Sequence, residues 1–504
     1  MPLEYETYDD AAEKFSWEER WELFDGDRDS FNIAHECIDR HDDEMTAARV
    51  KFDDGHSETY TIGTLKQRTG QFANALAENG IEKGDRVAVM LDPGLELYTS
   101  LFGNCKRGAV HVQMSPLFGP DAIEYRIEDS NAEMLITTPE KANDVPESLD
   151  IETLLVGDEF EEFIAGQPTE FEWDTKADDV SVLQYTSGTT GRPTGHEMLH
   201  KTASFVAVRM QFAYGLRPTD RFFTTSSPSW AHGLWIGTVG PLALGNAVGA
   251  YAGAFDVETV LEALEEFKIT NFAAAATALR KIINHPSIDE YELVLERVGT
   301  AGEKIDEGTQ TQLREQLNVT VADIYGVSEF GGFIMNYNGF DDWTIKPGSI
   351  GKPFPGFEVT VLDDDGEELP PGEIGEIAVK RGDDWFRVGD LGSVDEDGYY
   401  WYKGRKDDVI ISAGYRIDPV EVEESLLKHD AVIEAAVVGK DHEERGKIVK
   451  GFVKVSEEET EALREDISGT VKSDLSKHEY PREIEFVDEF PRTPDGTKIK
   501  RNAL

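Results

Sequence analysis

The alternation of short apolar runs with amphipathic segments between residues 86 and 137 most constrains the fold. In order along the chain these segments read RVAVML, LELYTSLFGNCKRG, AVHVQM, GPDAIEYRIEDS and AEMLIT. Strands joined through helices form right-handed crossovers and pair in parallel. The same rhythm returns from DVETVLEALEEFKI through NFAAAATALRKII to RVGTAGEKI. The sequence therefore predicts an α/β fold with two layered sheets.

The pattern changes in the last third of the chain. In FEVTVLDDDGEELPPGEIGEIAVKR, two apolar runs flank a loop of Asp, Gly and Pro, which predicts an antiparallel hairpin and a β-rich part. After GYYWYKGRKDDVI come a strand, the helix PVEVEESLLKH, the strands IEAAVVG and GFVKV, and another helix. That is enough for a small α+β domain. We place an N-terminal domain at residues 1–405 and a C-terminal domain at 406–504.

The charge of the chain limits its partners. Asp and Glu number 100 against 49 Lys and Arg, a net charge of −51, which repels nucleic acid and anionic membranes. The acidic residues are interleaved with apolar segments, as on the solvated surfaces of halophilic proteins, and do not form a disordered tail. We expect a halophilic protein with neither nucleic acid nor a membrane among its partners. Whether the protein forms a homo-oligomer is left open.

The N-terminal segment and the two cysteines indicate in which compartment the protein is expected. MPLEYETYDDAAEKF lacks the basic and apolar regions of a signal peptide, and Cys37 and Cys105 stand far apart without a partner motif. We therefore expect a cytoplasmic protein without disulfides.

Between Arg221 and Asp256 no residue is charged, but six glycines, Pro241 and Asn246 favour a buried helix–turn–strand at a pocket over a membrane span.

The segment VSVLQYTSGTTGRP at 180–193 is a strand followed by a loop of small and hydroxyl residues. Backbone N–H groups of a glycine-rich turn converge on an anion, and Ser and Thr hydroxyls add donors and metal ligands, so the loop suits a phosphate. The alternative is a surface loop of Gly, Ser and Thr. With its preceding strand, the segment resembles the phosphate loop of the adenylate-forming (AMP-binding) superfamily.

Four further segments carry the same resemblance, in the family's order. They are DIYGVSE at 323–329, FRVGD at 386–390, GRKDDVIISAGYRIDPVEVE at 404–423 and KHEYPREIEFVDEFPRTPDGTKIKR at 477–501. The chain is most similar to the short- and medium-chain acyl-CoA synthetases. The resemblance implies two α/β sheets with a β-barrel-like part, a mobile C-terminal domain, and formation of an acyl-adenylate from ATP and a carboxylate before acyl transfer to coenzyme A.

The resemblance also implies an ATP site. Its phosphate loop is expected to bind phosphates, Tyr325 to stack on adenine, and Asp390 to accept from the ribose hydroxyls. Glu329 is expected to act in catalysis and, with Thr189, to bind Mg²⁺, which prefers oxygen ligands. The full set of implied ATP-binding residues is Thr186, Ser187, Gly188, Thr189, Thr190, Gly191, Gly302, Glu303, Lys304, Asp323, Ile324, Tyr325, Gly326, Ser328, Asp390, Arg405 and Arg416.

Two of these, Arg405 and Arg416, are expected to pair with ribose or phosphate. The alternative is a surface ion pair with Asp407, Asp408 or Asp418.

The resemblance also implies roles for residues in the C-terminal part of the chain. Lys498 is the candidate catalytic lysine, which donates to the carboxylate and the α-phosphate as charge develops. Lys406 and Asp407 form the hinge about which the C-terminal domain turns between the two half-reactions. Gly414 and Tyr415 are expected at the coenzyme A channel.

The acyl pocket is expected at SPSWAHGLWIG, with Trp230 and His232 as gates for an aliphatic chain or a flat ring. His232 has an equal alternative as a packed histidine bonded to backbone.

The chain departs from the family pattern at three places. Thr194 stands where the family has a lysine after Pro193, the loop before Asp390 is short, and Thr497 is inserted before Lys498. The leading function is an AMP-forming acyl-CoA synthetase for a short- or medium-chain or aromatic acid. The alternatives are acyl transfer to the phosphopantetheine of a carrier protein and a catalytically weakened acyl or nucleotide sensor.

Overall fold

The computed structural model of the protein describes residues 3–186, 193–327, 329–412, 415–442, 446–475, 480–492 and 499–504. The chain packs into two compact units. The first comprises Met1–Glu6, Ser16–Ala274 and His285–Val298, and the second Thr7–Phe15, Ala275–Asn284 and Gly299–Leu504. The fold is α/β, with two large mixed sheets, a curled half-barrel sheet and a small C-terminal α+β domain, which confirms the predicted fold class.

One sheet lies wholly in the first unit, with strand order β6-β5-β3-β4-β7-β8. All its pairs are parallel except β7 with β8. The strands are β3 (Arg86–Met90), β4 (Val110–Met114), β5 (Ala132–Thr137), β6 (Glu152–Leu155), β7 (Val180–Thr186) and β8 (Thr194–Leu199). The helices are α2 (Ile62–Glu78), α3 (Leu95–Arg107), α4 (Pro120–Ser130) and α5 (Asp158–Ile164). The predicted strand–helix alternation between 86 and 137 is therefore confirmed.

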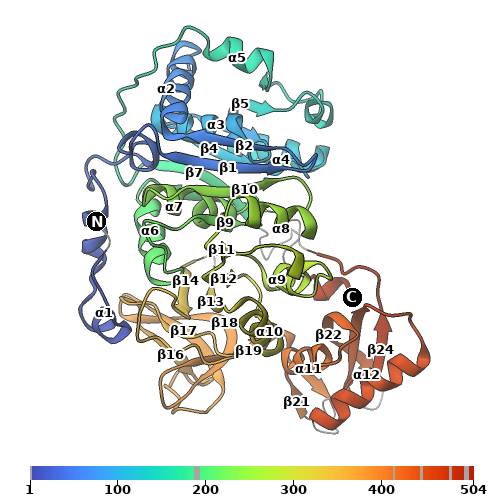
Figure 1. The fold of residues 1–504 in the computed structure, drawn as a ribbon. Coiled ribbons are helices and arrows are strands. Elements are labelled where there is room, and N and C mark those ends of the chain that lie inside the picture. Colours follow the sequence, from blue (N-terminus) through green and yellow to red (C-terminus); the bar gives the residue numbers. More distant parts are fainter. Residues whose placement is uncertain are drawn as a thin grey trace. The chain divides into compact units, whose positions relative to one another are not determined.

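Alternate residues of β3 pack on opposite faces of this sheet. Val87 and Val89 join a core with side chains of α2 and α5, whereas Ala88 and Met90 join one with Ile123 of α4. Figure 1 shows the helices α2, α4 and α5 near the strands of this sheet. This is the period of two that a strand buried on both faces requires. Helices thus cover both faces of the sheet.

The first unit also contains strands in the order β11-β9-β10-β1-β2. They are parallel except β1 with β2. These strands are β1 (Thr46–Phe52), β2 (Ser57–Thr61), β9 (Phe222–Thr224), β10 (Val248–Ala252) and β11 (Asn271–Ala273). The helices near them in sequence are α6 (Thr202–Phe212), the π-helix η4 (His232–Val239), α7 (Gly240–Ala243) and α8 (Val257–Glu266).

The uncharged stretch after Arg221 therefore folds as the predicted helix–turn–strand. None of the described helices combines the length and apolar character needed to cross a bilayer.

The second unit holds a hairpin, a curled sheet and the C-terminal lobe. Its first elements are α1 (Tyr8–Lys14), α9 (Ala276–Ile283), α10 (Glu307–Leu317), β13 (Thr320–Val327), β14 (Gly331–Met335) and β15 (Lys352–Pro353); β12 (Arg297–Ala301) leads into it from the first unit. The curled sheet is antiparallel throughout and runs β16 (Val359–Leu362), β17 (Gly375–Arg381), β18 (Asp384–Val394) and β19 (Tyr400–Arg405). The predicted hairpin is the β16–β17 pair.

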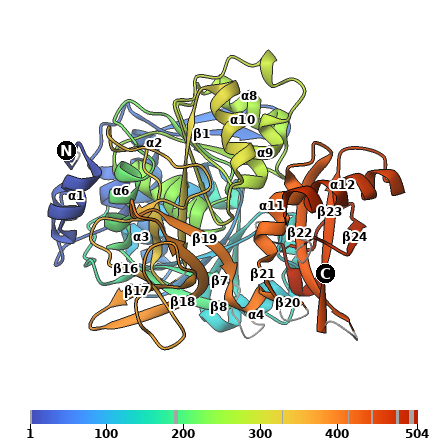
Figure 2. The same ribbon diagram turned by 90° about the horizontal axis from the view of Figure 1, so that it is seen from below.

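The C-terminal lobe has its own core. Its elements are β20 (Ile410–Ser412), β21 (Tyr415–Ile417), α11 (Pro419–Leu427), β22 (Val432–His442), β23 (Gly446–Val455), α12 (Glu461–Asp474) and β24 (Glu483–Phe486). Figure 2 shows α11 and α12 beside β22, β23 and β24. Val422 and Leu426 of α11 and Ile467 and Val471 of α12 pack with Val453 of β23. A domain boundary at Lys406 stays a prediction.

Candidate active site

Asp390 lies at the centre of a polar cluster in the second unit. This residue is only 4% exposed, and its carboxylate accepts a hydrogen bond from the Tyr325 hydroxyl and lies 3.3 Å from the Arg405 Nε. The two charged residues face each other across the antiparallel β18–β19 pair. Burial, followed by the neighbouring Asp390, raises the pKa of Tyr325, so its hydroxyl keeps its proton. Arg405 thus pairs with Asp390, a partner that the sequence did not suggest.

The ring of Tyr325 is held by aromatic neighbours. It lies 5.3 Å from the Phe333 ring and 5.7 Å from the Tyr402 ring. Sequence reasoning did not identify Tyr402, whose aromatic position two residues before Gly404 was the available signal. A ring fixed in this way is suited to stack on a planar group.

The hairpin of β13 and β14 sets the position of Glu329. Gly326 is required here because a Cβ at that position would lie 2.0 Å from the carbonyl oxygen of Gly331. Glu329 follows in the turn with an exposed side chain. Mg²⁺ is bound in nucleotide sites by one or two carboxylates together with phosphate oxygens, and Glu329 fits that need. Within the described residues no group of three His, Cys, Asp or Glu side chains is arranged to hold a metal.

A second group of predicted residues lies between β12 and α10. Gly302 has a φ of +91°, a backbone conformation that favours glycine. Glu303 accepts hydrogen bonds from the Thr277 backbone N–H and, at 2.9 Å, from its hydroxyl. Lys304 forms an ion pair with Glu424 of α11.

Burial raises the pKa of two acids in this region. The pKa of the fully buried Asp323 rises to about 7, with Lys304 opposing the shift, and that of Glu303 also rises. Glu303, Lys304 and Asp323 thus form one ionic region in which the two acids are desolvated.

The predicted hinge residue Lys406 is tied to the curled sheet. Its Nζ lies 3.1 Å from both Glu376 Oε2 and Asp364 Oδ1, and Arg387 Nη1 lies 2.9 Å from the same Glu376 oxygen. Burial of Glu376 opposes ionisation, but Arg387 and Lys406 outweigh it and lower the pKa. Lys406, the predicted hinge residue, therefore pairs with a carboxylate that stays charged.

The end of the chain is anchored by Arg501. Its guanidinium binds the buried Glu423 of α11, with Nη2 2.7 Å from Oε2, and reaches Asp408 Oδ2 at 3.5 Å. Arg492 pairs with Glu434, and its backbone bridges to Ile499. Sequence reasoning did not assign Arg501, although it ends the segment 477–501 that contains Lys498. Arg492 and Arg501, which lie on either side of residues 493–498, are thus held to the lobe by ion pairs.

In the first unit, His232 begins the π-helix η4. Its Nδ1 lies 3.1 Å from Ser226 Oγ and its Nε2 3.1 Å from the Tyr214 hydroxyl. Burial lowers its pKa to about 4, so the ring is neutral near pH 7. Its ring partners are therefore side-chain hydroxyls, not the backbone that the alternative prediction named. The half-buried Trp230 packs edge-on against Phe118 with ring centroids 6.1 Å apart.

Several predicted residues lie outside the described residues, or only their backbone is described. The former are Ser187, Gly188, Thr189, Thr190, Gly191, Ser328, Gly414 and Lys498. Those with a described backbone only are Thr186, Asp407, Tyr415 and Arg416. Their roles stay predictions, as do those of the other site residues.

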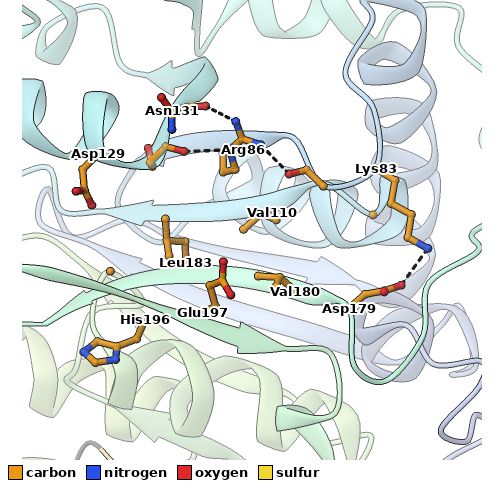
Figure 3. A pocket seen from close by; sticks show the side chains of 14 residues that line it. Lys83, Arg86, Val110, Asp129, Asn131, Asp179, Val180, Leu183, His196 and Glu197 are labelled. Carbon is orange, nitrogen blue, oxygen red and sulfur yellow. Dashed lines mark hydrogen bonds and ion pairs between the residues drawn. The ribbon is translucent and has the colours of Figure 1, made fainter.

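A hollow of about 960 Å³ lies on the first unit's sheet but away from the carboxyl ends of its parallel strands (Figure 3). It is lined by residues at the starts of β3, β4 and β7, including Arg86, Val110 and Val180. Its cations are engaged: Lys83 Nζ lies 2.9 Å from Asp179, and Arg86 donates to three backbone carbonyls. Since ligands of such sheets bind at the carboxyl ends of the strands, this hollow is not the candidate reaction site.

The comparison with protein-family models decides the family. The model described as "AMP-binding enzyme" matches residues 39–386, and "AMP-binding enzyme C-terminal domain" matches 421–497. The chain belongs to the AMP-binding enzyme family. It matches the acid–CoA ligases (AMP-forming) of this family over nearly its whole length, so the predicted enzyme class is confirmed.

Similar proteins agree with this assignment. Acetyl-coenzyme A synthetase of Bacillus subtilis (strain 168) is 32% identical, covering 99% of this chain and 94% of the relative. The crystal structure of Brucella canis acyl-CoA synthetase is 33% identical with a TM-score of 0.78, covering 99% of this chain and 98% of that one. An anthranilate CoA ligase solved with anthranoyl-AMP is 29% identical with a TM-score of 0.85, covering 94% and 96%.

Proposed function

We propose that this AMP-binding enzyme activates a carboxylic acid with ATP and transfers the acyl group to coenzyme A. A carboxylate oxygen attacks the α-phosphorus, the bond to the β-phosphate bridging oxygen breaks, and pyrophosphate leaves. The thiolate of coenzyme A then attacks the acyl carbonyl carbon and AMP leaves. ATP, Mg²⁺ and coenzyme A are the proposed co-substrates and cofactor.

The observation that carries the proposal is the Asp390 cluster. A buried carboxylate between a tyrosine hydroxyl and an arginine suits a ribose, because it accepts hydrogen bonds from two adjacent hydroxyls. Tyr325, in the neighbouring hairpin, would offer its ring to the adenine. Both residues fall in segments for which the family resemblance implies nucleotide binding.

The protein's own groups do little covalent chemistry in this reaction and much charge compensation. Glu329 would hold Mg²⁺, which neutralises phosphate charge when bound. Lys498 would donate to the α-phosphate as it becomes pentavalent. The neutral His232 and Trp230 would border the acyl group, and water exclusion there would protect the mixed anhydride.

The acid is proposed to be short- or medium-chain or aromatic. Acetyl-coenzyme A synthetase and the anthranilate ligase mark two ends of this range among the similar proteins. The charge excess favours work in concentrated salt.

The Lys498→Ala variant tests the adenylation step. Carboxylate-dependent exchange of labelled pyrophosphate into ATP should fall by about 10²–10³-fold, as for the loss of one charge-stabilising donor. Thioester formation from supplied acyl-adenylate should stay near the wild-type rate. Lys500→Ala, two residues along the same tail, is the matched control and should keep both activities. Equal loss of both half-reactions in Lys498→Ala contradicts the proposed role of this lysine. If the wild-type protein binds ATP but shows no pyrophosphate exchange, the sensor alternative is favoured.

A further inference from the structure

Both ring nitrogens of His232 form hydrogen bonds within the protein. Nδ1 lies 3.1 Å from the Ser226 hydroxyl and Nε2 3.1 Å from the Tyr214 hydroxyl. The ring is neutral near pH 7, because burial lowers its pKa to about 4. A neutral imidazole has one N–H donor and one acceptor nitrogen, and a hydroxyl can donate or accept, so both contacts are satisfied in either tautomer. His232 can therefore offer an acyl group only its ring carbons.

Tyr214, which follows helix α6, is fixed in the core of the first unit and is only 1% exposed. Its ring meets the Phe222 ring edge-on with centroids 5.9 Å apart, and its carbonyl accepts from Asn271 Nδ2 at 2.8 Å. Phe222 and Asn271 are paired across strands β9 and β11. The packing of these two strands thus directs the Tyr214 hydroxyl at His232.

Ser226 reaches the ring because the chain passes close to the start of η4. A Cβ on Gly233 would lie 2.4 Å from the Ser226 carbonyl oxygen and 2.0 Å from that of Ser227. Glycine is therefore needed directly after His232, since a side chain there would push the segment 226–227 away from the helix. The Ser226 backbone N–H also donates to Thr224 Oγ1 at 3.1 Å. The serine hydroxyl is thus held beside Nδ1.

Two other polar side chains of this segment also have partners within the fold. Ser229 Oγ donates to a backbone carbonyl of β4 at 3.3 Å, and Trp235 Nε1 donates to Gln184 Oε1 at 3.3 Å. The stretch 222–255 contains no charged residue. The fold itself thus uses the polar atoms around His232, and the surface that remains suits a hydrocarbon group.

We infer that Tyr214 and Ser226 are specificity-determining residues of the acyl site. By occupying both ring nitrogens of His232, they deny a hydrogen bond to any polar group on the acid, so the site selects an acid with a hydrocarbon tail. A hydroxyl placed beside the ring would lose its water without gaining a partner, which weakens binding. The inference rests on the proposed function, since it assigns His232 to the border of the acyl group.

The test compares acids that differ only by a methyl or a hydroxyl group at the far end. The pairs are pentanoate with 4-hydroxybutyrate, heptanoate with 6-hydroxyhexanoate, and 4-methylbenzoate with 4-hydroxybenzoate. Pyrophosphate exchange gives the ratio of kcat/KM within each pair, and this ratio does not depend on the fraction of a variant that folds. The wild type should prefer the methyl acid about 5- to 150-fold in at least one pair.

Two variants each free one nitrogen of the ring. Tyr214→Phe exposes Nε2 to a hydroxyl of the acid, and Ser226→Ala exposes Nδ1. Each should lower the preference for the methyl acid about three- to tenfold, which corresponds to one hydrogen bond. Ser226→Thr keeps the hydroxyl and should keep the wild-type ratio. Tyr337→Phe is the matched control, because Tyr337 is also buried and donates to the Pro353 carbonyl at 2.8 Å in the second unit.

The outcomes separate this inference from the proposed function. If Tyr214→Phe or Ser226→Ala shifts the ratio no more than Tyr337→Phe does, the role of that residue is overturned while adenylation stands. A wild type that accepts the hydroxy acid as well as the methyl acid in every pair overturns both roles, as does exchange with acetate alone. If the wild type shows no exchange with any acid, the proposed function is overturned and the inference with it.

Discussion

Replacing Asp390 by Asn keeps the shape of the side chain but removes the charge that would accept both ribose hydroxyls. A hydrogen bond to a charged partner contributes about 1.5–3 kcal/mol, against about 1 kcal/mol for a neutral pair. Two ribose contacts therefore lose about 1–4 kcal/mol, or roughly 5- to 1,000-fold in kcat/KM for ATP. Because Asp390 is only 4% exposed, solvent screening should diminish this effect little.

The assay is pyrophosphate exchange with ATP and with 2′-deoxyATP. The wild type should discriminate against the deoxynucleotide, and Asp390→Asn should lose most of that discrimination, because the missing hydroxyl no longer meets a charged acceptor. Asp395→Asn is the control, since Asp395 pairs with Lys346 at 2.7 Å after the same strand. The reasoning is refuted if Asp390→Asn retains the wild-type preference between the two nucleotides.

Three further outcomes are expected. Burial lowers the pKa of His111 to about 4 and of His200 to about 3. As the pH falls below about 6.5, these two histidines take up protons in the unfolded chain but stay neutral in the folded chain, which lowers the free energy of unfolding. The urea concentration at the midpoint of unfolding should therefore fall between pH 6.5 and 4, and a midpoint that does not change with pH contradicts this. The net charge of −51 predicts that Tm and activity rise between about 0.1 and 2 M KCl, and a maximum at low salt contradicts it. Asp407→Pro, which fixes φ at the hinge, should keep pyrophosphate exchange but block thioester formation; equal loss of both argues against a hinge.

Local pattern was enough to predict much of the fold. The segments from Arg86 to Thr137 form the predicted parallel strands and helices, and alternate residues of β3 and β5 meet different cores. The β16–β17 hairpin and the C-terminal α+β lobe follow from the same local signals. The antiparallel β8 was not predicted, since its sequence, TGHEML, carries no run of β-branched residues.

The interaction partners of the site residues could not be predicted from the sequence, because they depend on strand register and side-chain direction. The pairing of Asp390 with Arg405 requires the β18–β19 register, and that of Lys304 with Glu424 joins residues 120 positions apart. The two hydroxyls on His232 come from separate segments, at 214 and 226. Motifs located these residues in the chain, but only the fold pairs them.

The most direct measurement is exchange of labelled pyrophosphate into ATP with acetate, butyrate, octanoate and benzoate, followed by addition of coenzyme A. We predict exchange that requires one or more of these acids but no coenzyme A, then AMP and thioester in equal amounts once the thiol is added. Release of ADP instead of AMP, or ATP binding without acid-dependent exchange, would contradict the assignment of adenylation to this chain.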